Sequence, residues 1–218
     1  MALPSPLVSR VGRFLVIHEE SFAGVSISSN VYVLRDEGSF YIFDASGHKS
    51  LLSYLASMGI HGSLIAGVFL THGHYDHVRG LESLREYSPT AYISSRDRQL
   101  MEETVRGYPS CSDFSEAKEV LSRLGLVSIP TPGHTPGSTC FYSPDESLLI
   151  SGDTVFTDGY FGRTDLPGGS DSDMLESLER LSCMRVEALL PGHGPVASES
   201  GSRHILDALS CAKGMLRG

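Results

Sequence analysis

The stretch FLTHGHYDHVRG, residues 69–80, places three histidines and one aspartate within six positions, namely His72, His74, Asp76 and His77. It ends the run SLIAGVFLTH (63–72), whose unbroken apolar part is typical of a strand buried on both faces. Polar residues at the end of such a strand lie in the loop layer, where α/β proteins carry their chemistry. Four ligand-type side chains there would be costly without a partner, so the cluster predicts a metal site.

Three later strand-like runs end in residues of the same kind. IPTPGHTPGS, LLISGDTVF and ALLPGHGP supply His134, Asp153 and His193, each beside Gly or Pro residues that allow a sharp bend. Taken singly, a histidine at a strand end is usually a solvated loop residue. Together with the 69–80 stretch, these loops nevertheless hold five of the nine histidines, and long separations in sequence mean that the four segments can meet only through folding.

Composition narrows the class of protein. The chain has 218 residues, 40% hydrophobic and 20% charged, as expected of an ordinary globular protein. Its formal net charge of −9 disfavours nucleic acid and anionic lipid as partners. We expect a small-molecule substrate. No apolar run has the roughly 20 residues of a membrane helix, and no signal peptide is evident, so we expect a cytoplasmic protein.

Cysteine spacing argues against a disulfide framework or a zinc knuckle. The chain contains no CxxC, and we expect its cysteines to be reduced, mostly buried side chains. The four are widely spaced: Cys111, Cys140, Cys183 and Cys211.

Strand-like and helix-like segments alternate along the chain. Strands are expected at 13–17, 30–35, 39–44, 63–72 and 90–94 and in the runs LVSIPTPG, STCFYS, SLLISGD and EALLPGHG. Helices are expected at 51–58, with Ser50 as cap and Gly59 as stop, and at 81–87, 95–106, 113–124, 170–181 and from about 202. No GxGxxG follows the first strand, so a Rossmann fold is disfavoured. We therefore expect one layered α/β domain over 1–218.

These motifs together resemble the metallo-β-lactamase fold superfamily. HGHYDH, His134, Asp153 and His193 match its metal-binding motifs in order, over about residues 10–200. Segment 152–170, GDTVFTDGYFGRTDLPGGS, is similar to that of short hydrolases of the glyoxalase II type. The resemblance implies a four-layer αββα sandwich of two mixed β-sheets.

The resemblance also implies two adjacent metal sites. His72, His74 and His134 would bind the first ion, Asp76, His77 and His193 the second, and Asp153 would bridge the two. All of these are nitrogen and oxygen donors, which zinc, iron and manganese all accept. The expected metals are two divalent ions, with zinc as the first choice and iron or manganese as alternatives. Asp44 matches an aspartate that orients ligands in the family, and Asn30 is a further candidate for such a role.

The expected function is hydrolysis of thioesters such as S-lactoylglutathione by a metal-activated hydroxide, with Asp76 and Asp153 as the catalytic carboxylates. Arg163 and Tyr160 are candidates for substrate binding. The alternatives are a persulfide dioxygenase with one iron held by His72, His134 and Asp153, or a metal-binding module without activity. A nuclease is disfavoured by the acidic balance. The oligomeric state is left open.

Overall fold

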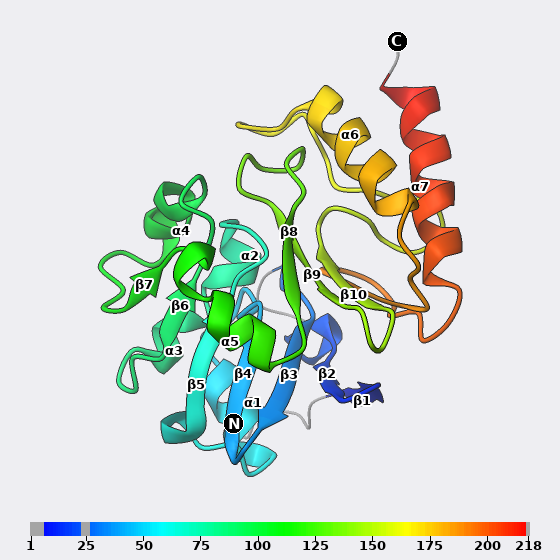
Figure 1. The fold of residues 1–218 in the computed structure, drawn as a ribbon. Coiled ribbons are helices and arrows are strands. Elements are labelled where there is room, and N and C mark those ends of the chain that lie inside the picture. Colours follow the sequence, from blue (N-terminus) through cyan, green and yellow to red (C-terminus); the bar gives the residue numbers. More distant parts are fainter. Residues whose placement is uncertain (1–6, 23–26, 217–218) are drawn as a thin grey trace.

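Two β-sheets form the centre of the protein in a computed structural model that describes residues 7–22 and 27–216 (Figure 1). The described residues of the first sheet run in the order β1-β2-β3-β4-β5-β6-β7, and those of the second in the order β11-β10-β9-β8. The strands are Val8–Val11 (β1), Phe14–Ile17 (β2), Val31–Asp36 (β3), Ser39–Phe43 (β4), Ile65–Phe69 (β5), Thr90–Tyr92 (β6), Cys111–Ser112 (β7), Val127–Pro130 (β8), Thr139–Ser143 (β9), Leu148–Gly152 (β10) and Ala188–Pro191 (β11).

Both sheets are mixed. Strands β1 to β4 pair antiparallel and β4 to β7 pair parallel, whereas β8 to β10 pair antiparallel and β10 pairs parallel with β11. Strands β3 and β4 are joined by a tight hairpin at the DEG segment (36–38), where Glu37 and Gly38 both have positive φ. Two successive residues with positive φ match the right-handed twist of the strands, which explains why the short DEG segment suits this hairpin.

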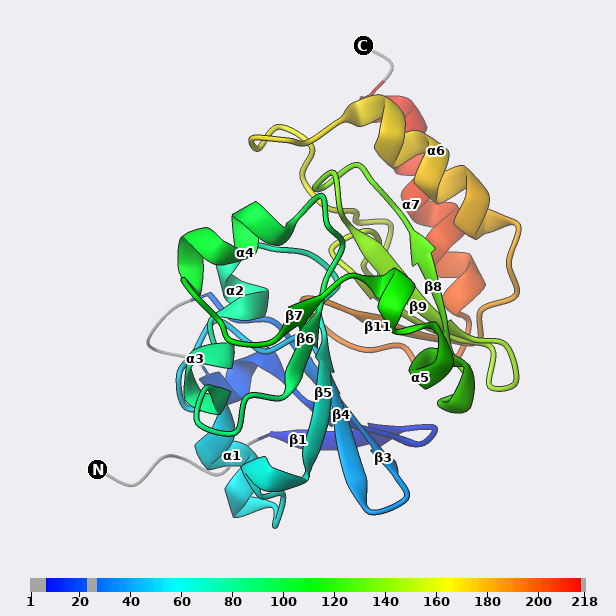
Figure 2. The ribbon, with the colours of Figure 1, turned by 60° about the vertical axis from the view of Figure 1, so that its left-hand side comes forward.

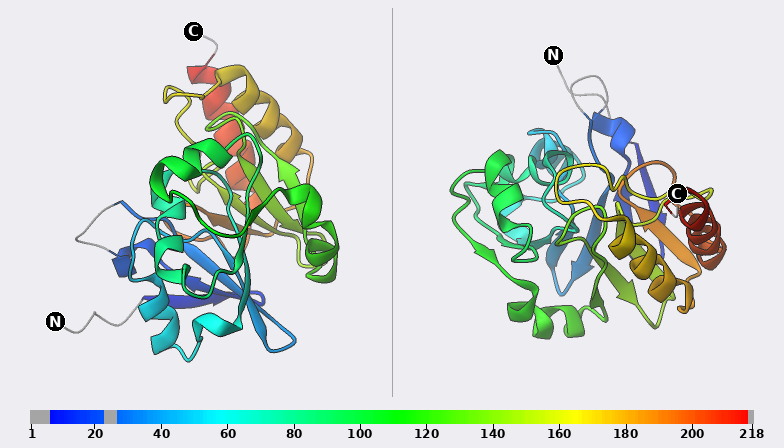
Figure 3. Two further views of the ribbon diagram at one scale, coloured as in Figure 1. Left: turned by 90° about the vertical axis from the view of Figure 1, so that its left-hand side faces the viewer. Right: turned by 90° about the horizontal axis from the view of Figure 1, so that it is seen from above.

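Helices cover the outer faces of the two sheets, so that four layers are visible from above (Figure 3). Helices α6 and α7 lie side by side on the second sheet (Figure 2). The helices are α1 (Leu51–Ser57), α2 (Tyr75–Val78), α3 (Leu81–Leu84), α4 (Arg98–Thr104), α5 (Lys118–Arg123), α6 (Asp171–Ser182) and α7 (Gly201–Met215), with 3₁₀ turns η1 (Glu19–Phe22), η2 (Gly62–Leu64) and η3 (Phe114–Glu116). Within the described ranges, no helix is both long enough and apolar enough to cross a membrane.

Three apolar clusters fill the spaces between the layers. Strand β3 shows how one strand serves two of them: Val31 and Val33 face the helices beside the first sheet, and Tyr32 and Leu34 face the second sheet. Side chains alternate along a strand, so burial on both faces produces a continuous apolar run. The third cluster lies between the second sheet and helices α6 and α7. The αββα sandwich predicted from the resemblance is confirmed.

Some local predictions need correction. The helix expected at 113–124 is divided, because Asp113 and Glu116 form a capping box around the 3₁₀ turn η3, and α5 starts only at Lys118. Ser50 does occupy the position before α1, but its hydroxyl contacts the His48 ring and makes no capping bond. The segments expected at 81–87 and 95–106 shorten to α3 and α4. Strands β1 and β7 were not predicted.

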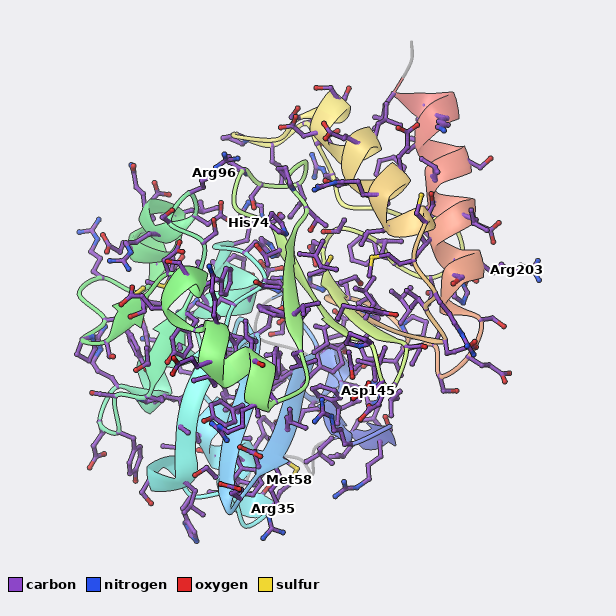
Figure 4. All side chains as sticks on the ribbon, in the orientation of Figure 1. Arg35, Met58, His74, Arg96, Asp145 and Arg203 are labelled. Atoms are coloured by element: carbon purple, nitrogen blue, oxygen red, sulfur yellow. The ribbon has the colours of Figure 1, made fainter. Side chains whose placement is uncertain are left out.

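The carboxyl ends of five strands meet at one edge of the sandwich. In the first sheet these are β4 and β5, and in the second they are β8, β10 and β11. Two backbone hydrogen bonds join the sheets there: Thr139 N donates to Thr71 O at 2.9 Å, and Asn30 N donates to Gly192 O at 2.8 Å. His74 lies at this edge, between the two sheets (Figure 4). Loops that leave these strands are therefore brought together.

Candidate metal centre

All seven residues predicted as metal ligands lie at this edge. His72 and His74 follow β5, and Asp76 and His77 lie in the single turn of α2 that comes next. His134 lies in the loop between β8 and β9, Asp153 follows β10, and His193 follows β11. Their ligand atoms form three groups, each within 4.8 Å: His72, His74 and His134; His72, His77 and Asp153; Asp76, His77 and His193.

The first and third groups are compact sets of ring nitrogens and carboxylate oxygens. In the first, His74 Nδ1 lies 2.9 Å from His134 Nε2. In the third, His193 Nε2 lies 3.3 Å from His77 Nε2 and 3.1 Å from Asp76 Oδ2. Such separations leave room for one cation at the centre of each set.

Asp153 stands between these two sets. Its Oδ1 lies 3.2 Å from His77 Nε2, and its Oδ2 lies 3.5 Å from His193 Nε2 and 3.6 Å from His134 Nε2. The side chain is buried, with 9% of the residue's surface exposed. One carboxylate therefore contacts histidines of both sets.

Acceptors behind the rings fix which nitrogen faces the centre. His77 Nδ1 donates to Asp44 Oδ2 at 2.8 Å, and His134 Nδ1 donates to the Arg163 carbonyl at 2.7 Å. A neutral ring that donates through Nδ1 carries its lone pair on Nε2, the atom that faces the cluster. Asp44 is itself held because Thr71 donates to it from both its backbone N and its hydroxyl. The orienting role expected for Asp44 thus has direct contacts behind it.

Glu19 supports the last histidine, and sequence reasoning missed it. His193 Nδ1 donates to Glu19 Oε2 at 2.7 Å, and Gly194 N donates to Glu19 Oε1 at 2.9 Å. Asn30 holds the same loop, because its amide nitrogen donates to the carbonyls of Pro191 and Gly194 while its amide oxygen accepts from Glu19 N. An isolated Glu far from the histidine motifs offers no signal of this role.

Asp97 joins the two loops of the first set and was also missed. Asp97 lies directly before α4, and only 1% of its surface is exposed. Oδ2 accepts from Gly73 N at 2.9 Å and from the Thr135 hydroxyl at 2.7 Å, and Oδ1 accepts from Gly137 N at 2.7 Å. Gly73 lies between His72 and His74, whereas Thr135 follows His134. An aspartate before a helix has the pattern of an ordinary N-cap, so local sequence does not indicate this link.

Burial and neighbouring groups shift the pKa values of the residues in the cluster. Burial, followed by the nearby His77, holds the pKa of His72 well below its usual value. Burial would lower the pKa of His193 as well, but its hydrogen bonds to Asp76 and Glu19 and the charge of Asp153 raise it to about 10. Burial opposes ionisation of Asp153, yet the charge and hydrogen bond of His77 keep its pKa well below the usual range.

The residues present fit a divalent metal ion. Within the described part of the chain, the buried His72 Nε2 has no hydrogen-bond partner. Leaving a buried polar atom without a partner is unfavourable, whereas coordination to a cation would satisfy it. The donor set consists of imidazole nitrogens and carboxylate oxygens, which suits zinc, iron and manganese.

A cavity of about 600 Å³ opens beside the cluster. Arg163 lines it, but its guanidinium donates to both oxygens of Asp165, at 2.9 and 2.8 Å. Tyr160 is 69% exposed and lies instead along a hollow beside α7. The residues that line the cavity are Ile27, His74, Tyr75, Asp76, Leu100, Glu103, Thr104, His134, Asp153, Phe156, Phe161, Gly162, Arg163, Leu166 and His193.

Three comparisons relate the chain to known proteins. The model of the metallo-beta-lactamase superfamily matches residues 26–193. A Bacillus subtilis (strain 168) protein named probable metallo-hydrolase YqgX is 31% identical over 84% of this chain and 95% of its own. A hydroxyacylglutathione hydrolase of Bartonella tribocorum is 30% identical over 67% of this chain and 58% of its own. The crystal structure of TTHA1623 in a di-iron-bound form has a TM-score of 0.65 at 27% identity and covers 78% of this chain and 89% of that one.

Proposed function

This chain belongs to the metallo-beta-lactamase superfamily, and we propose that it is a metal-dependent thioesterase of the glyoxalase II type, with S-lactoylglutathione as its reference substrate. The observation that carries the proposal is the pair of donor sets that share Asp153. The relative named hydroxyacylglutathione hydrolase supports the choice of thioester.

In this proposal His72, His74 and His134 hold one ion, Asp76, His77 and His193 hold a second, and Asp153 is shared. Zinc is the first choice of metal, with iron or manganese as alternatives. When bound, the two ions supply a hydroxide at neutral pH and stabilise the negative charge that develops on the carbonyl oxygen.

The chain's own residues position this chemistry. The Arg163 carbonyl, Asp44 and Glu19 hold the rings of His134, His77 and His193 so that each Nε2 faces the cluster. Asp76 lines the cavity, and its carboxylate orients the proton of the attacking nucleophile. The overall reaction adds the water oxygen to the carbonyl carbon, breaks the carbon–sulfur bond and gives the proton to the departing thiolate.

The test combines metal analysis with a turnover assay on the purified protein. We expect about two metal ions per chain and hydrolysis of S-lactoylglutathione. Both His72→Ala and Asp153→Ala should abolish turnover, whereas His61→Ala, at an exposed histidine away from the cluster, should not.

One outcome would overturn the proposal in favour of the persulfide dioxygenase. That outcome is one iron per chain, oxygen consumption on a persulfide and no thioester turnover. Retention of full thioester turnover by the His72→Ala and Asp153→Ala variants would equally remove the metal centre from the mechanism.

A further inference from the structure

The cavity beside the metal centre is walled mainly by apolar side chains. Leu100, on α4, forms one side, and Phe156, Phe161 and Leu166, from the segment between β10 and α6, form another. Ile27 completes the apolar lining and is 67% exposed. The cavity volume of about 600 Å³ falls within the range typical of small-molecule sites.

Most of these apolar side chains lie outside the core clusters. Phe161 packs against the third apolar cluster, but among the described residues Ile27, Leu100, Phe156 and Leu166 belong to none of the three clusters. Each is at least partly exposed. Their hydrocarbon surface is therefore available to a ligand, and its removal from water would favour binding.

The charges around the cavity do not suit an anionic thiol carrier. Glu103 is exposed and lines the cavity from α4. Arg163 is the single Lys or Arg among the described lining residues, and Asp165 already engages its guanidinium with two hydrogen bonds. A glutathione thioester carries two carboxylates and one ammonium group, so its net charge is negative, and among these lining residues it would meet the carboxylate of Glu103 and no cation without a partner.

We propose that the site takes thioesters or esters in which the group next to the scissile carbonyl is neutral and apolar. This inference rests on the proposed hydrolase function and narrows its substrate class. The apolar group lies on either the acyl side or the thiol side of the carbonyl, and the two sides are separable by experiment. Glutathione thioesters are then turned over, but they are poor substrates.

The central experiment uses two matched series of substrates with the metal-loaded protein. One series lengthens an unbranched acyl chain on N-acetylcysteamine, a neutral thiol, and the other lengthens an alkyl thiol on acetate. We expect kcat/KM to rise about fourfold per methylene in the series whose variable group enters the cavity, until the cavity is full. The same acyl group on glutathione should react more slowly than on N-acetylcysteamine.

Two variants test the lining directly. Leu100→Ala should lower kcat/KM about tenfold for the longest chain and leave the acetyl substrate nearly unchanged. Glu103→Lys should raise kcat/KM for the glutathione thioester about three- to tenfold. Glu102→Lys is the matched control, because Glu102 is an exposed neighbour on the same helix that does not line the cavity.

A binding measurement separates failure of this inference from failure of the thioesterase proposal. Titration calorimetry with straight-chain carboxylic acids and with alkyl thiols, the two products, measures the affinity of the cavity for each product and requires no turnover. If no thioester is hydrolysed but affinity for either product rises with chain length and falls in Leu100→Ala, the thioesterase proposal fails and the apolar cavity stands. Flat affinity and flat kcat/KM in both series, or a preference for glutathione thioesters, would overturn the inference.

Discussion

Replacing Asp97 with asparagine tests whether one buried carboxylate holds two ligand loops together. The carboxylate accepts from Gly73 N and the Thr135 hydroxyl on Oδ2 and from Gly137 N on Oδ1. Asparagine keeps the shape but has one oxygen and one NH₂ group. In either orientation of the amide, at least one backbone N–H faces a donor and loses its acceptor.

The size of the effect follows from those three bonds. A buried donor without a partner costs about 1–3 kcal/mol, so the free energy of unfolding should fall by about that amount in Asp97→Asn. The larger consequence concerns the first donor set, because either amide orientation loses one of the bonds that tie the loop carrying His72 and His74 to the loop carrying His134. Loss of a supporting contact of this kind lowers metal affinity about 10–100-fold.

The effect should be confined to one of the two proposed ions. His77 and His193 are supported by Asp44 and Glu19, which Asp97 does not contact. Titration of the loaded protein with a chelator should therefore release one metal ion from Asp97→Asn at a lower chelator concentration than from the parent protein, with the second ion little changed.

Asp113→Asn is the matched control for this variant. Asp113 also accepts from two backbone N–H groups, those of Ser95 and Ser115, but it lies on the surface at η3. It should lose some stability, measured by urea unfolding, and keep its metal affinity. If Asp97→Asn behaves in the same way, the reasoning that links Asp97 to metal binding is refuted.

Three further predictions follow from the structure. Asp44→Asn should lower affinity for the second ion about 10–100-fold, because the Asp44 carboxylate accepts the hydrogen bond that His77 Nδ1 donates. Chelator titration should therefore release the second ion first, the opposite of Asp97→Asn. Gly192→Ala should lower the free energy of unfolding by about 1–3 kcal/mol and weaken binding of both ions, because a Cβ there would collide with Asp153 and lie 2.7 Å from His77 Cε1. An unfolding curve and a metal content equal to those of the parent protein would contradict this prediction. Burial raises the pKa of Cys140 from 9.0 to about 11, so the folded state resists ionisation of the thiol and the free energy of unfolding should fall as pH rises from 9 towards 11. Cys140→Val removes the thiol. Urea unfolding should therefore show a fall between pH 8.5 and 10.5 that is about 2 kcal/mol smaller in this variant than in the parent protein.

The sequence was most informative where local pattern and global fold impose the same requirement. Strand β5 is apolar on both faces because helices cover one side of its sheet and the second sheet covers the other, so its end marks the loop layer. The family resemblance then supplied the layer order, which the structure confirms. That the chain is one domain over 1–218, and that it is cytoplasmic, stay predictions.

The supporting residues were beyond local pattern. Glu19 lies 174 positions from His193, and Asp97 lies 40 positions from Gly137, so nothing in the neighbourhood of either reveals its partner. Each also has an ordinary local explanation, as a loop carboxylate or a helix cap. Burial of a carboxylate among backbone N–H groups is a property of the folded chain, and it appears only once the loops are assembled.

Each donor set draws on both sheets. His72, His74, Asp76 and His77 belong to the half of the chain that forms the first sheet, whereas His134, Asp153 and His193 come from the half that forms the second. Bound ions would then cross-link the two sheets of the sandwich. Each tenfold rise of the free metal concentration above its dissociation constant adds about 1.4 kcal/mol to the free energy of unfolding. The protein's resistance to proteases would therefore increase with the concentration of available metal.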